Sequence, residues 1–404
     1  MLLTIVILTC LLAYKLTGCG AIFKTIQNKP LADTIFLTIF FVFLLIPMSR
    51  INMSDISLQE NRTLAKWQPL INENHKINFE FGKNFNDWFN DRFRLRNLFI
   101  SSNHHIRFNL SNTIYKEPPR YFNKNSYWTF NTDWVSIKSD GKNFTQIINN
   151  IDLLKNFCDR NNIKLYILLA PTTSEVYDKE FTQTTGIKRI INNGEDFVKY
   201  TDDSTDFVIS PLNELKAAKP YNPYTKGDVH WNHYGAYIAY LKLMQRIKTD
   251  FPDIQVLNKD AFKITKSMYS KTDYDNYPTN GNLYKELQIP DKYLDTEYYY
   301  FTYKKQSNIQ TTKSNVSDVK TYNNNYTNKY SAYMIGDSYE ENLSDFIIPT
   351  FHKVIKRRYN NSGSKALRFS KFKDDIIKEK PDILIITIVS FELSKLKDMF
   401  KGEN

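Results

Sequence analysis

Cysteine is scarce in this chain, with three residues in 404. Two of them lie within the apolar first fifty residues, and Cys158 stands alone in the remainder. A single thiol cannot form an internal disulfide, so a hydrophobic core must stabilise this part of the protein. The hydrophobic fraction of 42% supplies enough material for one. Cys158 falls on the apolar face of a predicted helix, which indicates a buried structural thiol.

Histidine and glycine are also few, and this excludes several kinds of site. The six histidines and three cysteines never fall into a metal-binding spacing with acidic partners. There is no glycine-rich loop of the kind that holds a nucleotide phosphate. We therefore expect neither a metal nor another cofactor.

Acidic side chains are few in residues 351–380, which hold ten Lys or Arg against three Asp or Glu, while the whole chain has a formal charge of +11. Such a segment fits a solvated face, or a surface for anionic lipid or an acidic polymer. It is not part of a nucleic-acid-binding motif.

The first fifty residues form two hydrophobic segments joined by the basic link "KTIQNKP". Each is close to the ~20 residues that cross a bilayer. Lys24 and Lys29 in the link favour a cytoplasmic position for it. We therefore expect residues 1–50 to be a membrane anchor of two transmembrane helices, with the rest of the chain on the extracytoplasmic side, in the periplasm or at the cell surface.

Two alternatives remain open for this region. The stretch "LTGC" at residues 16–19 is similar to a lipoprotein cleavage site, although no basic segment precedes it. The other alternative is that the second hydrophobic segment alone crosses the membrane, as a signal anchor. Either arrangement still exports the globular part of the chain.

Residues 51–143 are expected to form a juxtamembrane helical segment and the entry to the next domain. In residues 79–110, aromatic side chains recur every three or four positions, which predicts a long helix with an aromatic face.

The pattern changes at residue 144 to alternating helices and apolar strands. Such alternation predicts a three-layer α/β domain with a mainly parallel sheet over residues 144–404. Residues 261–329, rich in Tyr and Asn, interrupt the alternation. We interpret them as an insertion with two β-hairpins and a sugar-facing surface. The expected helices cover residues 144–162 and 233–247, and the expected strands residues 163–171, 206–211, 331–336 and 381–389.

Two short motifs carry the candidate chemistry, "DVHW" at residues 228–231 and "GDSYE" at residues 336–340. A serine hydroxyl becomes a nucleophile when a base lies within hydrogen-bond reach and an acceptor orients that base. Ser338, His230 and Asp228 supply this combination. Ser338 follows a predicted strand at the carboxyl edge, where α/β sheets place their sites and where backbone N–H groups can bind an oxyanion.

The residues around these motifs have simpler interpretations as well. Asp228 and Ser338 could cap local structure, and His230 could be an ordinary loop histidine. Either motif alone fits that view, but their joint occurrence at element edges favours catalysis. Trp231 is expected to line the pocket or to anchor the loop, and Asn232 to be the N-cap of the next helix.

The chain resembles the SGNH-hydrolase-like acetyltransferases of exopolysaccharide modification, the AlgJ and AlgX type. In that family the Asp-x-His motif precedes the serine, as it does here. The resemblance implies that Ser338 accepts the acetyl group, that His230 is the general base and that Asp228 orients it. It also implies a polytopic membrane-bound O-acyltransferase as the partner that supplies acetyl groups. Five stretches carry the resemblance: "ENRTLA" (60–65), "DRFRLR" (91–96), "DVHW" (228–231), "GDSYE" (336–340) and "PDILI" (381–385).

This sequence departs from the family pattern in places. A Lys is expected near Thr173, and Asp is commoner than Asn at position 282. The last strand is followed by "SFELSKL", which makes Glu392 a candidate for substrate contact. Further candidates for the pocket are Trp231, Asp337 and Tyr339.

These observations predict a membrane-anchored O-acetyltransferase that acts on an exported or cell-surface polysaccharide through an acetyl-serine intermediate. Two alternatives use the same features. A carbohydrate acetylesterase would employ the same triad with water as the acceptor. A non-catalytic assembly subunit would hold glycan through the basic segment and the Tyr-rich insertion.

Overall fold

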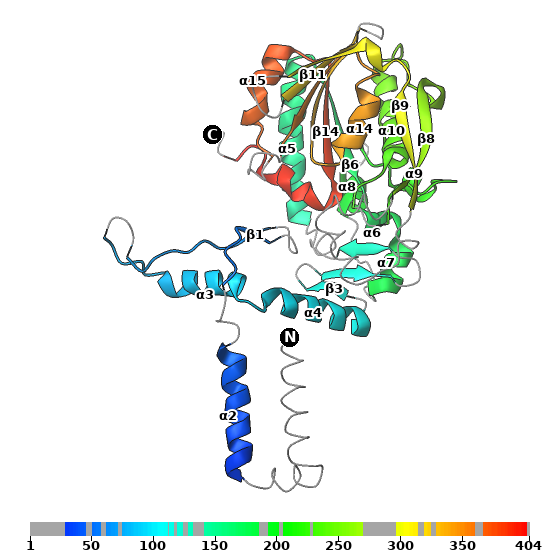
Figure 1. Ribbon diagram of the computed structural model, residues 1–404. Helices are drawn as coiled ribbons and strands as arrows, with labels where there is room; N and C mark the ends of the chain where they lie inside the picture. The colour runs from blue at the N-terminus through cyan, green and yellow to red at the C-terminus, as the bar shows by residue number, and fades with distance from the viewer. Residues whose placement is uncertain are drawn as a thin grey trace. The chain divides into compact units, whose positions relative to one another are not determined.

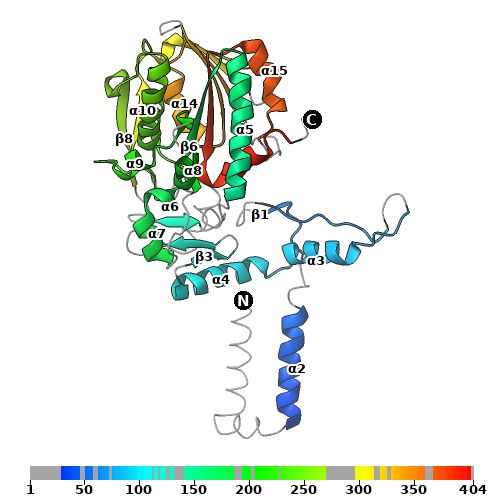
Figure 2. The same ribbon diagram turned by 180° about the vertical axis from the view of Figure 1, so that it is seen from behind.

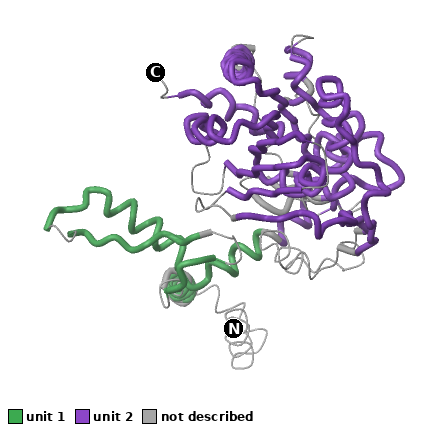
Figure 3. The backbone as a smooth tube through the Cα atoms, turned by 90° about the horizontal axis from the view of Figure 1, so that it is seen from above, with its two compact units in different colours: residues 1–103 green, residues 104–404 purple. Residues whose placement is uncertain are grey.

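The structure is a computed structural model that divides the chain into two compact units, residues 1–103 and 104–404 (Figure 3). We treat each unit separately, and the domain limits expected at residues 50 and 143 stay predictions. The residues described are 29–45, 51–57, 62–71, 75–111, 113–116, 119–123, 128–131, 141–185, 193–201, 205–226, 229–269, 296–313, 319–324, 329–359 and 367–401.

The second apolar segment forms helix α2 (Lys29–Leu45), which has 17 residues. At ~1.5 Å per residue it rises about 25 Å, less than the ~30 Å hydrocarbon core of a bilayer. Within the described ranges, no helix combines the length and the apolar character needed to cross a membrane. The structure therefore does not support the spanning helix predicted here. The other predicted span, in residues 1–28, lies outside the described residues.

The prediction of a single long aromatic helix was wrong. The segment forms two helices, α3 (Phe81–Arg92) and α4 (Arg96–Ser111). Phe93 between them is extended, with φ −64° and ψ 147°, and bridges to Ile51. This backbone pairing ends α3, while the aromatic spacing persists on its surface, where the rings of Phe85 and Phe89 stack 6.1 Å apart.

A buried arginine joins two of the motif stretches in the smaller unit. The Arg92 guanidinium donates hydrogen bonds to the carbonyl oxygens of Asn52, Ser54 and Ala65, at 3.0, 2.7 and 3.1 Å. The neighbouring Asp91 carboxylate accepts the Ala65 N–H at 2.7 Å. The stretches at residues 60–65 and 91–96 therefore have a structural role, and the same unit holds the short strands β1 (Ile56–Ser57) and β2 (Arg62–Thr63).

The larger unit is built on a seven-stranded sheet in the order β10-β11-β13-β12-β14-β6-β7. The five strands from β13 to β7 are parallel, and β10 and β11 add an antiparallel edge. β14 is buried along its whole length, as expected for a parallel strand covered on both faces. The strands are β6 (Lys164–Ala170), β7 (Val208–Ile209), β10 (Ile309–Lys313), β11 (Val319–Asn324), β12 (Ser331–Gly336), β13 (Lys353–Arg358) and β14 (Ile383–Val389).

Helices cover both faces of this sheet, which confirms the predicted three layers (Figures 1 and 2). α5 (Gly141–Arg160) and α15 (Ser370–Glu379) lie on one face, and α10 (His233–Asp250) and α14 (Glu340–Ile347) on the other. Cys158 on α5 is fully buried, as predicted, and burial raises the pKa of its thiol to about 12. A thiol with that pKa is inert at neutral pH.

Shorter elements complete the larger unit. A three-stranded antiparallel sheet precedes α5, and four short helices follow β6 or β7. The strands of the small sheet are β3 (Thr113–Lys116), β4 (Pro119–Phe122) and β5 (Thr129–Asn131), and the helices are α6 (Thr173–Val176), α7 (Asp178–Thr185), α8 (Asn193–Thr201) and α9 (Leu212–Lys216).

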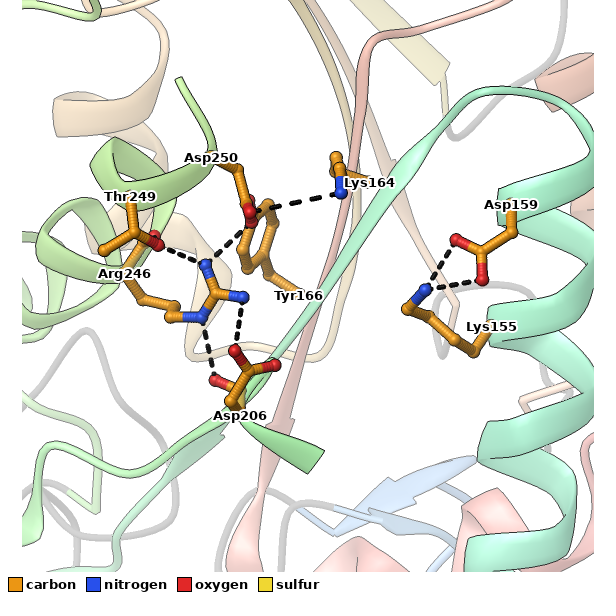
Figure 4. Close-up of polar contacts among 8 residues, drawn as sticks. All are labelled: Lys155, Asp159, Lys164, Tyr166, Asp206, Arg246, Thr249 and Asp250. Carbon is orange, nitrogen blue, oxygen red and sulfur yellow. Dashed lines mark hydrogen bonds and ion pairs between the residues drawn. The ribbon is translucent and has the colours of Figure 1, made fainter. Parts of the chain in front are cut away.

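An arginine network fixes α10 to the edge of the sheet (Figure 4). Arg246 donates to the Asp206 carboxylate beside β7 and to Asp250 one turn further along α10, both at 2.7 Å. The Tyr166 hydroxyl on β6 donates to the same Asp250 carboxylate at 2.5 Å. Because these contacts occupy the guanidinium, we regard the cluster as structural.

The Tyr- and Asn-rich segment supplies two antiparallel pairs, β8 (Phe262–Tyr269) with β9 (Thr296–Tyr303), and β10 with β11. The first pair packs on α10, where the rings of Tyr237 and Phe301 stack 5.2 Å apart and Phe346 of α14 contacts both. The second pair extends the main sheet. Two short 3-10 helices, Lys259–Ala261 and Gln306–Asn308, lead into β8 and β10.

Gly235 in the first turn of α10 provides a test of this packing. A Cβ atom there would lie 2.3 Å from the Pro223 carbonyl oxygen and 2.9 Å from the Trp231 Cβ. Gly235→Ala should therefore lower the free energy of unfolding by about 3 kcal/mol, because a backbone carbonyl cannot move aside cheaply. Denaturant unfolding of the full chain measures this.

The matched control is Gly82→Ala near the start of α3, where an added Cβ meets nothing within 4 Å. This variant should leave the unfolding of the larger unit unchanged. An unaltered midpoint for Gly235→Ala would contradict the tight contact between α10 and the segment at Pro223.

Candidate active site

Ser338 stands on the turn between β12 and α14, at the carboxyl edge of the parallel strands. A Cβ at Gly336 would lie 2.7 Å from the Glu340 Cβ, so this close approach of strand and helix requires glycine. Ser338 is partly exposed, whereas both of its neighbours are buried. The chain runs from β6 to β7 on one side and from β12 to β13 on the other, and such a reversal is where α/β sheets bind ligands.

His230 reaches this serine from the loop before α10. Its Nε2 atom lies 2.7 Å from the Ser338 Oγ, although 108 residues separate the two in sequence. This distance is within the hydrogen-bond reach that a general base needs. The structure thus brings these two predicted side chains together. Asp228 lies outside the described residues, so its orienting role stays a prediction.

Two reciprocal hydrogen bonds lock the histidine loop to the serine turn. The Tyr339 hydroxyl donates to the carbonyl oxygen of Val229, just before the histidine, at 2.6 Å. The Trp231 indole N–H donates to the carbonyl oxygen of Tyr339, just after the serine, at 3.0 Å. The two rings also meet edge to face, with centroids 5.3 Å apart. Each motif therefore positions the other through the residues that flank its reactive side chain.

Further contacts support the same loop. The Thr173 hydroxyl donates to the Val229 carbonyl oxygen at 3.2 Å, and the Asn342 amide donates to that of Trp231 at 2.8 Å. Thr173 is the position near which the family pattern has a Lys. As predicted, Asn232 caps α10, because its side-chain oxygen accepts the Gly235 N–H at 3.1 Å.

The comparison with known families rests on this part of the chain. The family model for the SGNH hydrolase-like domain, acetyltransferase AlgX, matches residues 125–342, a range that includes both His230 and Ser338. The chain belongs to this family. Among curated proteins, none matches the chain.

Solved structures of low sequence identity share the fold of this AlgX-family chain. Bacillus cereus PatB1 with a sulfonyl adduct is 14% identical, with a TM-score of 0.51 and coverage of 70% of this chain and 100% of that one. The O-acetyltransferase domain of Pseudomonas putida AlgJ is 12% identical, with a TM-score of 0.42 and coverage of 68% and 92%. Pseudomonas aeruginosa AlgX is 14% identical, with a TM-score of 0.43 and coverage of 68% and 66%.

Asp337 was predicted to line the pocket of this AlgX-family site, but its carboxylate is buried and holds the backbone. One oxygen accepts the Tyr339 N–H at 2.9 Å, and the other accepts the Val389 N–H at the end of β14, at 2.7 Å. Trp231 and Tyr339 are equally buried, at 1% and 2% exposure. We therefore interpret all three as residues that position the site, because a substrate cannot reach their side chains.

Glu392 has partners other than the catalytic pair. The Tyr359 hydroxyl donates to its Oε2 atom at 2.6 Å, and Lys395 contacts its Oε1 atom. Burial raises the pKa of Tyr359, and the nearby carboxylates of Asp337 and Glu392 raise it further. The predicted substrate contact of Glu392 is not seen, because these two neighbours bind its carboxylate.

Sequence reasoning missed two buried carboxyl groups beside the site. Glu340, the first residue of α14, is fully buried, and neither of its carboxyl oxygens forms a hydrogen bond to another described residue. Burial raises the pKa of Glu340 well above its usual range, so it is uncharged at neutral pH.

The second buried carboxyl group, Glu175, connects the ends of β6 and β14. It accepts the Thr172 N–H at 2.5 Å and the Ser390 hydroxyl. The spacing of Thr172 and Glu175 is that of a helix capping box, which is a signal the sequence contained.

The described side chains include no group of three or more His, Cys, Asp or Glu that could hold a metal ion. The chemistry we consider below therefore uses the chain's own serine and histidine.

The buried Asp337 predicts a specific dependence of stability on pH. Burial raises the pKa of its carboxyl group to about 6, against 3.8 in its ordinary state, while the N–H groups of Val389 and Tyr339 lower it. The folded protein therefore holds this proton more tightly than the unfolded chain does. Stability must fall as pH rises through the interval between the two pKa values.

The comparison with Asp337→Asn, which cannot ionise, isolates this effect. The unfolding free energy of the native protein minus that of the variant should fall by about 3 kcal/mol between pH 4 and pH 6. Denaturant titrations at several pH values measure it. Asp374→Asn, at an exposed position of α15, is the control. A difference that does not change with pH would contradict the assignment.

Proposed function

We propose that this protein is an O-acetyltransferase that modifies an exported or cell-surface polysaccharide through an acetyl-Ser338 intermediate. The observation that carries the proposal is the 2.7 Å contact between the His230 Nε2 and the Ser338 Oγ in a member of the AlgX acetyltransferase family. A serine so placed can be activated for nucleophilic attack, and family membership favours acetyl as the group that it accepts.

The proposed reaction has two half-reactions. The Ser338 Oγ attacks the carbonyl carbon of an acetyl donor while His230 Nε2 takes the hydroxyl proton. The donor's leaving group then departs with that proton, which leaves an ester on Ser338. A polysaccharide hydroxyl next attacks this ester and gives its proton to His230, and the serine hydroxyl is restored. Asp228 orients the imidazole in this scheme.

We further propose that residues 1–50 anchor the protein to a membrane and place the catalytic domain on the extracytoplasmic side. The support is the composition of α2, whose apolar side chains remain exposed. Phe36 is 66% exposed and Phe41 53%. Apolar side chains of this kind need an apolar environment such as lipid. A polytopic membrane-bound O-acyltransferase would bring acetyl groups to this location.

Removing the Ser338 hydroxyl tests the proposed chemistry. After incubation with p-nitrophenyl acetate, mass spectrometry of the native protein should find an acetyl group on the peptide that contains Ser338. Ser338→Ala should carry none, because the accepting atom is absent. His230→Ala should form the adduct about 10²- to 10⁴-fold more slowly, since the general base is lost.

The matched control is Ser210→Ala, a partly exposed serine that also follows a parallel strand, β7. It should acylate like the native protein. Appearance of acetyl on an added oligosaccharide supports a transferase, whereas loss of acetyl only to water indicates an esterase. If neither the native protein nor Ser338→Ala gains acetyl or turns over the ester, the protein is not an enzyme of this class.

The anchor and the partner can be tested together. The full chain should fractionate with membranes and co-purify in detergent with a polytopic membrane protein, because the apolar segments lie in residues 1–50. The chain without these residues should do neither. Recovery of the shortened chain in the membrane fraction, still bound to the same protein, would contradict this role.

A further inference from the structure

A groove of about 340 Å³ lies beside α14, outside the Ser338–His230 pair. β9 and β11 contribute its sides, and α14 and Lys356 of β13 line the rest. Its volume is within the usual range of ligand pockets. The lining residues used below are Tyr300, Tyr303, Lys320, Tyr322, Glu341 and Asp345.

The centre of this groove is an organised polar cluster. The Lys356 ammonium, on a residue that is 8% exposed, donates to the Glu341 carboxylate at 2.7 Å and to the Ser344 hydroxyl at 3.1 Å. Arg358 also approaches Glu341, at 3.5 Å. Glu341 remains 56% exposed despite these partners, so its carboxylate can still accept hydrogen bonds from a ligand.

Aromatic rings lie on both sides of this cluster. Tyr300 of β9 is 42% exposed, and its ring is supported by that of His233, with centroids 4.0 Å apart. Burial lowers the pKa of His233 to about 4, so this supporting ring is uncharged at neutral pH. Tyr303 and Tyr322 are half-buried. Exposed tyrosine rings offer an apolar face together with a polar hydroxyl.

These features together specify a class of ligand. A sugar ring has an apolar C–H face that packs on aromatic rings, and its hydroxyl groups both donate and accept hydrogen bonds. The groove offers donors on Lys320 and Lys356 and acceptors on Glu341 and Asp345. The formal charges of these four side chains cancel, so a polyanion gains no net attraction here.

We propose that this groove is a binding site for an uncharged oligosaccharide segment of the acceptor polymer. The assignment rests on the proposed function for its substrate class. The Glu341 N–H lies 3.4 Å from the Ser338 carbonyl oxygen, so the groove begins one helical turn from the nucleophile. From Glu341 to Ile348 it follows α14 for about 10 Å, at ~1.5 Å per residue. A polymer held there is kept close to Ser338.

Calorimetric titration of the full chain with chitopentaose, and separately with pentamannuronate, tests the groove. Chitopentaose should bind the native protein and Ser338→Ala alike. Tyr300→Ala, which removes an exposed ring, and Glu341→Gln, which removes a charge of the central cluster, should each raise its Kd about tenfold. Because both side chains are well exposed, circular dichroism should show that these variants fold.

The matched control is Tyr200→Ala on α8, a tyrosine that is 48% exposed and lies outside the groove lining. Its Kd should equal that of the native protein. Unchanged binding in Tyr300→Ala and Glu341→Gln, stronger binding of pentamannuronate, or no binding of chitopentaose would each overturn the assignment. If Ser338 forms no acetyl adduct but the groove variants still lose binding, the proposed function fails and the binding site stands.

Discussion

The pair of hydrogen bonds between the histidine loop and the serine turn is the constraint on which the candidate site depends. Tyr339, which follows the serine, binds the carbonyl group before His230, and Trp231, which follows the histidine, binds the carbonyl group of Tyr339. All these groups are withdrawn from water, so breaking either bond would leave a buried polar atom without its partner. The reactive side chains are therefore fixed by their neighbours, which touch no substrate.

This arrangement explains why the parallel sheet matters for the chemistry. The strand ends of β12 and β14 lie at one edge, and Asp337 joins them by accepting the N–H of Val389. Glu175 makes the corresponding connection between β6 and β14 through Ser390. Two buried carboxylates thus hold three strand ends under the serine. Their cost in desolvation is offset by hydrogen bonds from backbone N–H groups and a hydroxyl.

The groove beside α14 adds a second level to the same design. α14 begins at the serine turn, and its first exposed carboxylate, that of Glu341, belongs to the polar cluster of the groove. One short helix therefore connects the candidate nucleophile to a surface with the aromatic and polar groups that sugars require. The residues that build the far side come from β9 and β11, within the Tyr-rich insertion that the sequence predicted to face sugars.

The sequence alone determined the periodic features of this protein. Apolar runs at residues 163–171 and 381–389 predicted buried strands, and the spacing in residues 144–158 predicted helix α5, because burial on both faces of a sheet selects these patterns directly. Two motifs were enough to predict that Ser338 and His230 meet. Tertiary structure decided what a pattern cannot encode. Phe93 breaks the long aromatic helix because it pairs with Ile51, and Asp337, Trp231 and Tyr339 are positioning residues because they are buried. Burial and pairing depend on residues far away in the chain, so local spacing does not reveal them.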